Sequence, residues 1–188
     1  MKAVLDACVL YPTVLREILL GVAATGLYTP LWSPRILEEW ARATRKLGPG
    51  EEAYARGEVV AVTAAFPKAS VEPDAGLLRR LHLPDEDDIH VLAAAVTSGA
   101  DCIVTFNAAD FPRHILAAEG LERRDPDGFL WQLWSEDAGK VGAVVERVRQ
   151  KAETLSGEAQ PLRPLLKRTK LPRLAKAIEA GAARHHGA

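Results

Sequence analysis

The chain has 188 residues, of which 48% are hydrophobic, 6% aromatic and 26% charged, and its formal net charge is −1. This composition excludes a globally disordered protein, and the length suits one domain with an appendage rather than two full-sized domains. No apolar run reaches the ~18–20 residues of a membrane span, so we expect no membrane partner.

Short apolar runs alternate with helical patterns along the first part of the chain. A buried strand is predicted at residues 2–5, a helix at 12–26 and a second strand at 27–32. Ser33-Pro34 has the signature of an N-cap followed by a first-turn proline, and it predicts a helix over residues 35–46. The remaining elements predicted in this part are a helix at 51–65, a strand at 69–72, a helical turn at 77–81, a helix at 84–99 and a strand at 101–105.

This alternation predicts an α/β fold with a mainly parallel sheet covered on both faces. Beyond about Asp125 the pattern is purely helical, so we expect a first domain over residues 1–125 and a helical, basic C-terminal extension over 126–188. Val141, Val144, Val145 and Val148 have helical spacing and need burial, either against the domain itself or against a second subunit or partner helix. Residues 184–188 are expected to fray.

Two features bear on compartment and partners. Asp6 comes too early for a signal peptide, and Cys8 and Cys102 are too few for a disulfide framework, so we expect free thiols in a reducing cytoplasm. Residues 1–130 carry 13 Lys and Arg against 19 Asp and Glu, whereas residues 131–188 carry 11 against 6. A basic C-terminal part favours the binding of polyanions, but the charge alone does not identify a partner.

Polar side chains gather where the predicted parallel strands end. Asp6 ends the first strand, and Asn107 and Asp110 follow the strand at 101–105. Parallel α/β sheets bind ligands outside the carboxyl ends of their strands, so we expect these side chains on one edge. Further acids that can reach this edge are Asp85 and Asp88, at a helix start, and Glu38 or Glu39, on the helix after the second strand.

Carboxylates that gather without basic partners repel one another, and a hard divalent cation removes that cost. Oxygen-only ligands indicate Mg²⁺ or Mn²⁺ rather than zinc. Such a site is typical of phosphodiester chemistry, in which the ion activates water and neutralises charged oxygens.

Each of these residues also has a purely structural interpretation. Asp6 and Asp110 could cap the turns that follow them, and Glu39 could be a solvated helix residue. Asp85 and Asp88 could cap a helix or be stabilised in its first turn by the helix dipole. The two remaining side chains are Asn107, which could accept a tight turn, and Thr105, whose hydroxyl could hold a carboxylate or bind the backbone.

Four blocks occur in a characteristic order: Leu5–Pro12, Ser33–Trp40, Asp85–Ala95 and Ile103–Pro112. Together they resemble the motifs of PIN-domain ribonucleases, in the branch that includes VapC-type toxins, and the resemblance covers roughly residues 1–125. It implies a Rossmann-like three-layer α/β/α domain and a Mg²⁺- or Mn²⁺-dependent endoribonuclease site.

By this resemblance the metal-binding and catalytic acids are Asp6, Glu39, Asp88 and Asp110. Asp85, Thr105 and Asn107 are supporting side chains of the same edge. Many PIN domains carry an aspartate where this chain has Asn107, so its site has less negative charge. The resemblance also implies an RNA substrate and a cognate antitoxin that inserts a segment beside the site. A homodimer is a further partner that the sequence leaves open, since a second subunit could cover the valine stripe of residues 141–148.

An acidic site needs positive charge elsewhere to attract RNA. The basic residues that could contact phosphates are Arg16, Arg35, Arg42, Arg45, Lys46, Lys167, Arg168 and Lys170. Two alternatives stay open at this point. One is a catalytically weak PIN-fold module that binds RNA or protein, and the other is a DNA-directed nuclease on the same scaffold.

Overall fold

The computed structural model describes the backbone of residues 1–185 and the side chains of residues 1–181. The chain divides into two compact units, one formed by residues 1–11 and 28–124 and the other by residues 12–27 and those from 125 onward. The end that we expect to fray, residues 184–188, lies mostly outside the described part.

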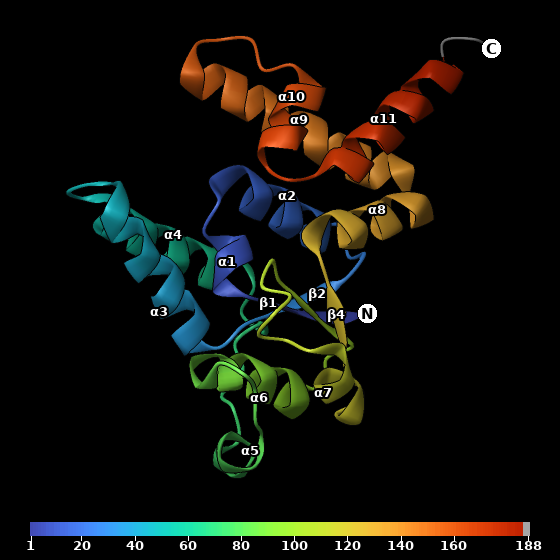
Figure 1. Ribbon diagram of the computed structural model, residues 1–188. Helices are drawn as coiled ribbons and strands as arrows, with labels where there is room; N and C mark the ends of the chain where they lie inside the picture. Colours follow the sequence, from blue (N-terminus) through green and yellow to red (C-terminus); the bar gives the residue numbers. More distant parts are fainter. Residues whose placement is uncertain (186–188) are drawn as a thin grey trace. The chain divides into compact units, whose positions relative to one another are not determined.

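The first unit is built on a parallel sheet (Figure 1). In the described residues four strands pair in the order β2 (Thr29–Leu31), β1 (Lys2–Leu5), β3 (Cys102–Val104) and β4 (Glu122–Arg124). All the pairings between these strands are parallel, and Val4 lies opposite Leu31 on one side and Ile103 on the other. The apolar residues of β1 and β3 are buried, which confirms the predicted α/β class with its parallel sheet.

Two helices of the first unit pack against this sheet. α6 (Ile89–Ser98) packs on β1 and β3, and α7 (Arg113–Ala118) packs on β4. The alanines of α6 are fully buried, and these small side chains let the helix approach the strands closely.

Ser33 caps α3 (Pro34–Ala43) as predicted, since its Oγ accepts the N–H of Ile36 at 3.2 Å. The other elements are α1 (Ala7–Leu10), the 3₁₀ helix η1 (Thr44–Leu47), α4 (Glu51–Ala65), α5 (Ala75–Arg80) and the 3₁₀ helix η2 (Glu86–Asp88).

The predicted strand at 69–72 is wrong. This segment makes one isolated bridge, between Ser70 and Trp32, in which Trp32 donates to Ala69 O and Val71 donates to Trp32 O. Pro73 has no N–H and ends the pairing there, while the helix that starts after Ser33 ends it on the other side. β4 was not predicted, because its residues Glu122-Arg123-Arg124 are all charged and carry no apolar alternation.

The second unit is helical in the residues that the structure describes. It contains α2 (Thr13–Ala24), α8 (Pro126–Glu136), α9 (Ala138–Ser156), α10 (Leu162–Arg168) and α11 (Pro172–His185). The valine stripe of α9 is buried inside this unit, where α9 packs on α2 and α8. At the closest approach of α2 and α9, a Cβ added to Gly21 would lie 2.7 Å from a methyl group of Val144.

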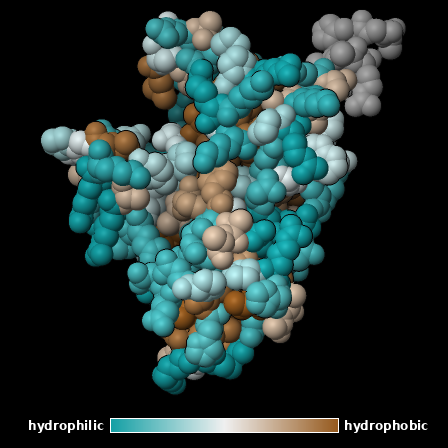
Figure 2. Space-filling view, viewed as in Figure 1, coloured by the Kyte–Doolittle hydropathy of each residue, from teal (hydrophilic) through white to brown (hydrophobic). Residues whose placement is uncertain are grey.

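The surface of the first unit is mainly polar. Figure 2 shows hydrophobic residues in small separate patches on the face in view, including one over α5 and α6 near the bottom. Among the described helices, none combines the length and the apolar composition that a membrane span requires.

Candidate active site

The candidate site lies at the carboxyl ends of β1 and β3, the two central strands of the sheet. β1 lies between β2 and β3, so the connections that follow β1 and β3 return to strands on opposite sides of this pair. Such a reversal opens a crevice in which parallel α/β sheets bind their ligands. Asp6 follows β1 directly, and its N–H donates to Val104 O at the end of β3, at 3.2 Å.

Asp6 is buried, with 6% of its surface exposed, and two donors hold one of its oxygens. Thr105 Oγ1 donates to Asp6 Oδ2 at 2.6 Å, and the thiol of Cys8 donates to the same oxygen at 3.1 Å. Burial and then the charge of Asp6 raise the pKa of Cys8 to about 12, so Cys8 is a neutral donor at physiological pH. Thr105 Oγ1 also accepts the N–H of Asn107 at 2.9 Å, which ties the loop after β3 to Asp6.

Three further carboxylates meet beside this loop. Asp85, Asp88 and Asp110 each offer one oxygen, and these three oxygens lie within 4.8 Å of one another. Burial, together with the negative charges of Asp6, Asp85, Asp110 and Glu39, raises the pKa of Asp88 to about 6. Carboxylates from separate segments of the chain thus all raise the pKa of Asp88.

Asn107 bridges two of these acids. Its Nδ2 donates to Asp110 Oδ2 in a short hydrogen bond and lies 3.5 Å from Asp88 Oδ2. The amide thus supplies donors at a position where an aspartate would have added a further negative charge. This contact offsets part of the repulsion between Asp88 and Asp110.

Glu39 projects from α3 and is held by basic groups of two elements. Arg35 Nε donates to Glu39 Oε1 at 3.0 Å, and His90 Nε2 lies 2.9 Å from the same oxygen. Burial favours the neutral acid, but the contacts and charges of His90 and then Arg35 outweigh it and hold the pKa of Glu39 below its ordinary value. Arg35 Nη2 also donates to Asp87 O at 3.1 Å, which links α3 to the segment that carries Asp88.

The acids share one arrangement of their oxygens. In Asp6, Glu39 and Asp110 one carboxylate oxygen takes the neighbouring donors, and in the described residues the other has no hydrogen bond. None of Asp6, Asp85, Asp88 and Asp110 forms an ion pair with Lys or Arg in residues 1–181. Asp6, Glu39 and Asp110 are therefore each oriented by hydrogen bonds to one oxygen, and the other oxygen is available to a ligand.

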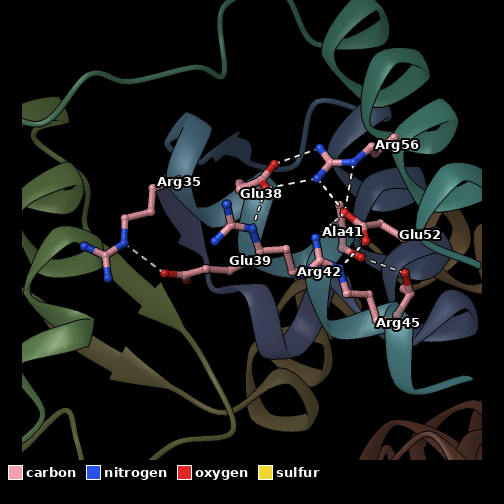
Figure 3. A network of polar contacts seen from close by, with 9 residues as sticks. Arg35, Glu38, Glu39, Ala41, Arg42, Arg45, Glu52 and Arg56 are labelled. Atoms are coloured by element: carbon pink, nitrogen blue, oxygen red, sulfur yellow. Dashed lines mark hydrogen bonds and ion pairs between the residues drawn. The ribbon is translucent and has the colours of Figure 1, made fainter.

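Most arginines beside α3 form a separate ion-pair network (Figure 3). Arg56 of α4 donates to Glu38 at 2.8 Å and to Glu52 at 2.6 Å, and Arg42 donates to Glu38 at 2.6 Å. Hydrogen bonds from Arg56 and then Arg42 lower the pKa of Glu38 to about 2. Both oxygens of Glu38 thus accept hydrogen bonds within this network. Its neighbour Glu39 instead lies close enough to Asp88 for its charge to raise the pKa of Asp88.

The basic residues predicted to contact RNA have different surroundings. Arg45 pairs with Glu52, and the ammonium of Lys46 lies 4.7 Å from the centre of the Tyr11 ring. The residues of this group that belong to the second unit are Arg16, which is buried on α2, and Lys167, Arg168 and Lys170 at the end of α10, where they are exposed.

Two side chains of the site were not predicted from the sequence. By pattern alone His90 is an ordinary residue on a helix flank and Cys8 a buried thiol. His90 is 3% exposed, and neither ring nitrogen has a well-formed hydrogen bond in the described residues although Nε2 touches Glu39. The available signal for His90 is its position two residues after Asp88, and for Cys8 its position two residues after Asp6.

Comparison with protein families gives one match. A family model for the PIN domain matches residues 2–109, more than half of the chain. The chain belongs to the PIN-domain family. No significant match was found among curated proteins or among solved structures.

PIN domains are generally metal-dependent nucleases, and the acids of this PIN domain fit a divalent ion. Asp85, Asp88 and Asp110 supply only oxygen donors, which are the ligands that Mg²⁺ and Mn²⁺ prefer. Burial and then the charges of the neighbouring acids raise the pKa of Asp88, and a bound cation would favour its ionised form instead.

Proposed function

We propose that this PIN-domain protein is an endoribonuclease that hydrolyses phosphodiester bonds of RNA and requires Mg²⁺ or Mn²⁺. The observation that carries the proposal is the meeting of Asp85, Asp88 and Asp110 in the electrostatic field of Asp6 and Glu39. The resemblance of the four sequence blocks to VapC-type ribonucleases favours RNA over DNA as the substrate.

Each acid has a distinct part in this proposal. Asp6, Glu39, Asp88 and Asp110 would hold the cation, with Asp85 beside them as a further oxygen ligand. When bound, the ion would activate water for attack on phosphorus and neutralise charge on the phosphate and the leaving oxygen.

The supporting side chains fix the geometry before substrate arrives. Thr105 and Cys8 hold Asp6 by one oxygen, so the other oxygen keeps its direction. Asn107 sets the spacing of Asp88 and Asp110. Positioning of this kind removes the reorganisation that flexible carboxylates would otherwise undergo in the transition state.

The test is cleavage of labelled single-stranded RNA and DNA in Mn²⁺ by the wild type and by Asp6→Asn. Asparagine keeps an oxygen for Thr105 and Cys8 but removes the charge, so we expect a folded protein with at least about 100-fold less RNA cleavage. Glu86→Gln is the matched control, because Glu86 is exposed, lies near the same acids and has no ion pair in the described residues. Cleavage of DNA instead would indicate the DNA-directed alternative, and cleavage of neither polymer would indicate the binding module.

We further propose that the protein is the toxin of a toxin–antitoxin pair, acts in the cytoplasm, and is inhibited by a cognate antitoxin beside the acids. Support comes from the VapC-type blocks and from the free thiols of Cys8 and Cys102. Induced expression should arrest growth for the wild type and not for Asp6→Asn. Co-expression of a small neighbouring reading frame should relieve the arrest, and size-exclusion chromatography would reveal a homodimer.

A further inference from the structure

A hollow beside β4 gathers positive charge next to the acidic edge. Its volume is about 390 Å³, and Arg113, Arg123 and Arg124 line it together with a single carboxylate, that of Glu122. Ala117 and Leu121 complete the lining. This size is in the range of small-ligand pockets and can take a phosphate with part of its sugar.

Two of the three arginines of this hollow, Arg113 and Arg123, have no ion pair in the described residues. Elsewhere in this unit Arg56 and Arg80 are each paired with acids within 2.8 Å, as is Arg42. In the hollow, Arg113 has no ion pair or side-chain hydrogen bond in residues 1–181, and Arg123 donates to backbone carbonyls alone.

Arg124 is the third cation, and it shares its charge with the only acid of the hollow. Its guanidinium lies 2.8 Å from Glu122 Oε2, and Glu122 is itself mostly exposed. Three guanidinium groups against one carboxylate leave an excess of positive charge in a concave site. Guanidinium groups donate two parallel hydrogen bonds to the oxygens of an anion, and a phosphate with its several oxygens can accept such bonds from more than one arginine.

The hollow is connected to the candidate active site through short contacts. Arg124 is the last residue of β4, and its carbonyl accepts the N–H of Thr105 at 3.0 Å. Arg123 Nη1 donates to Ala108 O and to Phe111 O, the latter at 3.1 Å, so it holds the loop that carries Asp110 from both sides. A strand bound across the acids would therefore have this positive hollow within reach along the same edge.

We propose that the hollow of Arg113, Arg123 and Arg124 binds a backbone phosphate of the single-stranded RNA substrate, away from the bond that is cleaved. The inference rests on the proposed nuclease function and adds the subsite that the acidic centre needs. The clustered carboxylates repel a polyanion, and a separate phosphate contact supplies affinity and fixes the register of the strand.

The test measures RNA binding rather than cleavage. A short fluorescein-labelled oligouridine is titrated with protein in EDTA, followed by fluorescence anisotropy, for the wild type and for the double variant Arg113→Gln, Arg124→Gln. We leave Arg123 unchanged because it also holds the loop after β3. Arg79→Gln is the matched control, since Arg79 is exposed on α5 and has no ion pair in the described residues.

The double variant should bind RNA about tenfold more weakly, and the slope of log affinity against log salt should fall by about 0.7 for each phosphate that the variant no longer binds. Glu122→Gln should tighten binding, because it removes the carboxylate that competes with phosphate for Arg124. Equally weakened binding in Arg79→Gln and in the double variant, or an unchanged salt slope, would overturn the assignment.

These outcomes are separate from those that test the nuclease itself. If the wild type fails to cleave RNA but the double variant binds it more weakly, the phosphate site stands and the nuclease proposal fails. If RNA is cleaved and the double variant binds as the wild type does, the nuclease stands and the hollow is not its phosphate site.

Discussion

Replacing Asp88 with asparagine should stabilise the metal-free protein while it abolishes RNA cleavage. The pKa of Asp88 is raised from its ordinary value of 3.8 to about 6, and one pKa unit corresponds to about 1.4 kcal/mol. Ionised Asp88 thus opposes folding by about 3 kcal/mol at most. Solvent screening of this half-buried group and the favourable helix N-terminus reduce the expected gain to about 1–2 kcal/mol.

The sign of this effect fixes its pH dependence. A carboxyl whose folded pKa is raised is most compatible with the fold when protonated, so its cost is absent below about pH 3.8 and complete above about pH 6. The stability difference between Asp88→Asn and the wild type should therefore be largest near pH 7.5 and shrink to about a third near pH 4.5. Saturating Mg²⁺ should reverse the order, because only the wild type keeps the full set of acids.

Thermal unfolding in EDTA, followed by circular dichroism, measures this difference. We expect Asp88→Asn to raise the melting temperature by about 3–6 °C near neutral pH. Glu86→Gln, an exposed acid of the same segment, should shift it by less than about 1 °C. A variant that melts below the wild type, or a gain that is the same at both pH values, would refute the argument that the acids are crowded.

Three further outcomes follow from the contacts of the site and of the second unit. His90→Ala should lower kcat for RNA cleavage by about 10–100-fold with KM little changed, and His90→Gln should restore part of it by presenting an amide nitrogen to Glu39. Asn107→Asp should lower the Mg²⁺ concentration needed for half-maximal cleavage and lower the melting temperature in EDTA, which a metal titration and a melt would show. Gly21→Ala should destabilise the protein by about 1–3 kcal/mol in urea unfolding through overlap with α9, whereas Gly142→Ala on the open side of α9 should stabilise it by about 0.5–1 kcal/mol.

Much of the first unit could be predicted because local signals and tertiary structure agree there. The apolar run of β1, the Ser33 cap and the helix of residues 51–65 each depend on neighbouring residues alone. β4 could not be predicted, because an edge strand of charged residues owes its conformation to pairing with β3. The strand predicted at 69–72 is wrong for the opposite reason. Its local pattern is typical of a strand, but in the structure the segment makes a single isolated bridge.

The candidate site shows the same division. Acids at strand ends and helix starts can be inferred from a sequence, because topology brings those positions to one edge. Which oxygen is held, and by which donor, depends on contacts between segments distant in sequence, as for Asp6 with Thr105 and Glu39 with His90. Periodicity carries no information on such pairs, so His90 looks like any other residue of a helix flank.

The path of the chain through α2 has a practical consequence for experiments on this protein. α2 lies between β1 and β2 in sequence and inside the stretch that matches the family model, yet its apolar side is covered by α9. A fragment that stops near Asp125 would remove α9 from the side of α2 that carries Gly21 and Glu17, and the uncovered helix would destabilise the fragment. Enzymology and crystallisation should therefore begin from a protein that includes all 188 residues, and a loss of activity after C-terminal trimming should first be checked for misfolding.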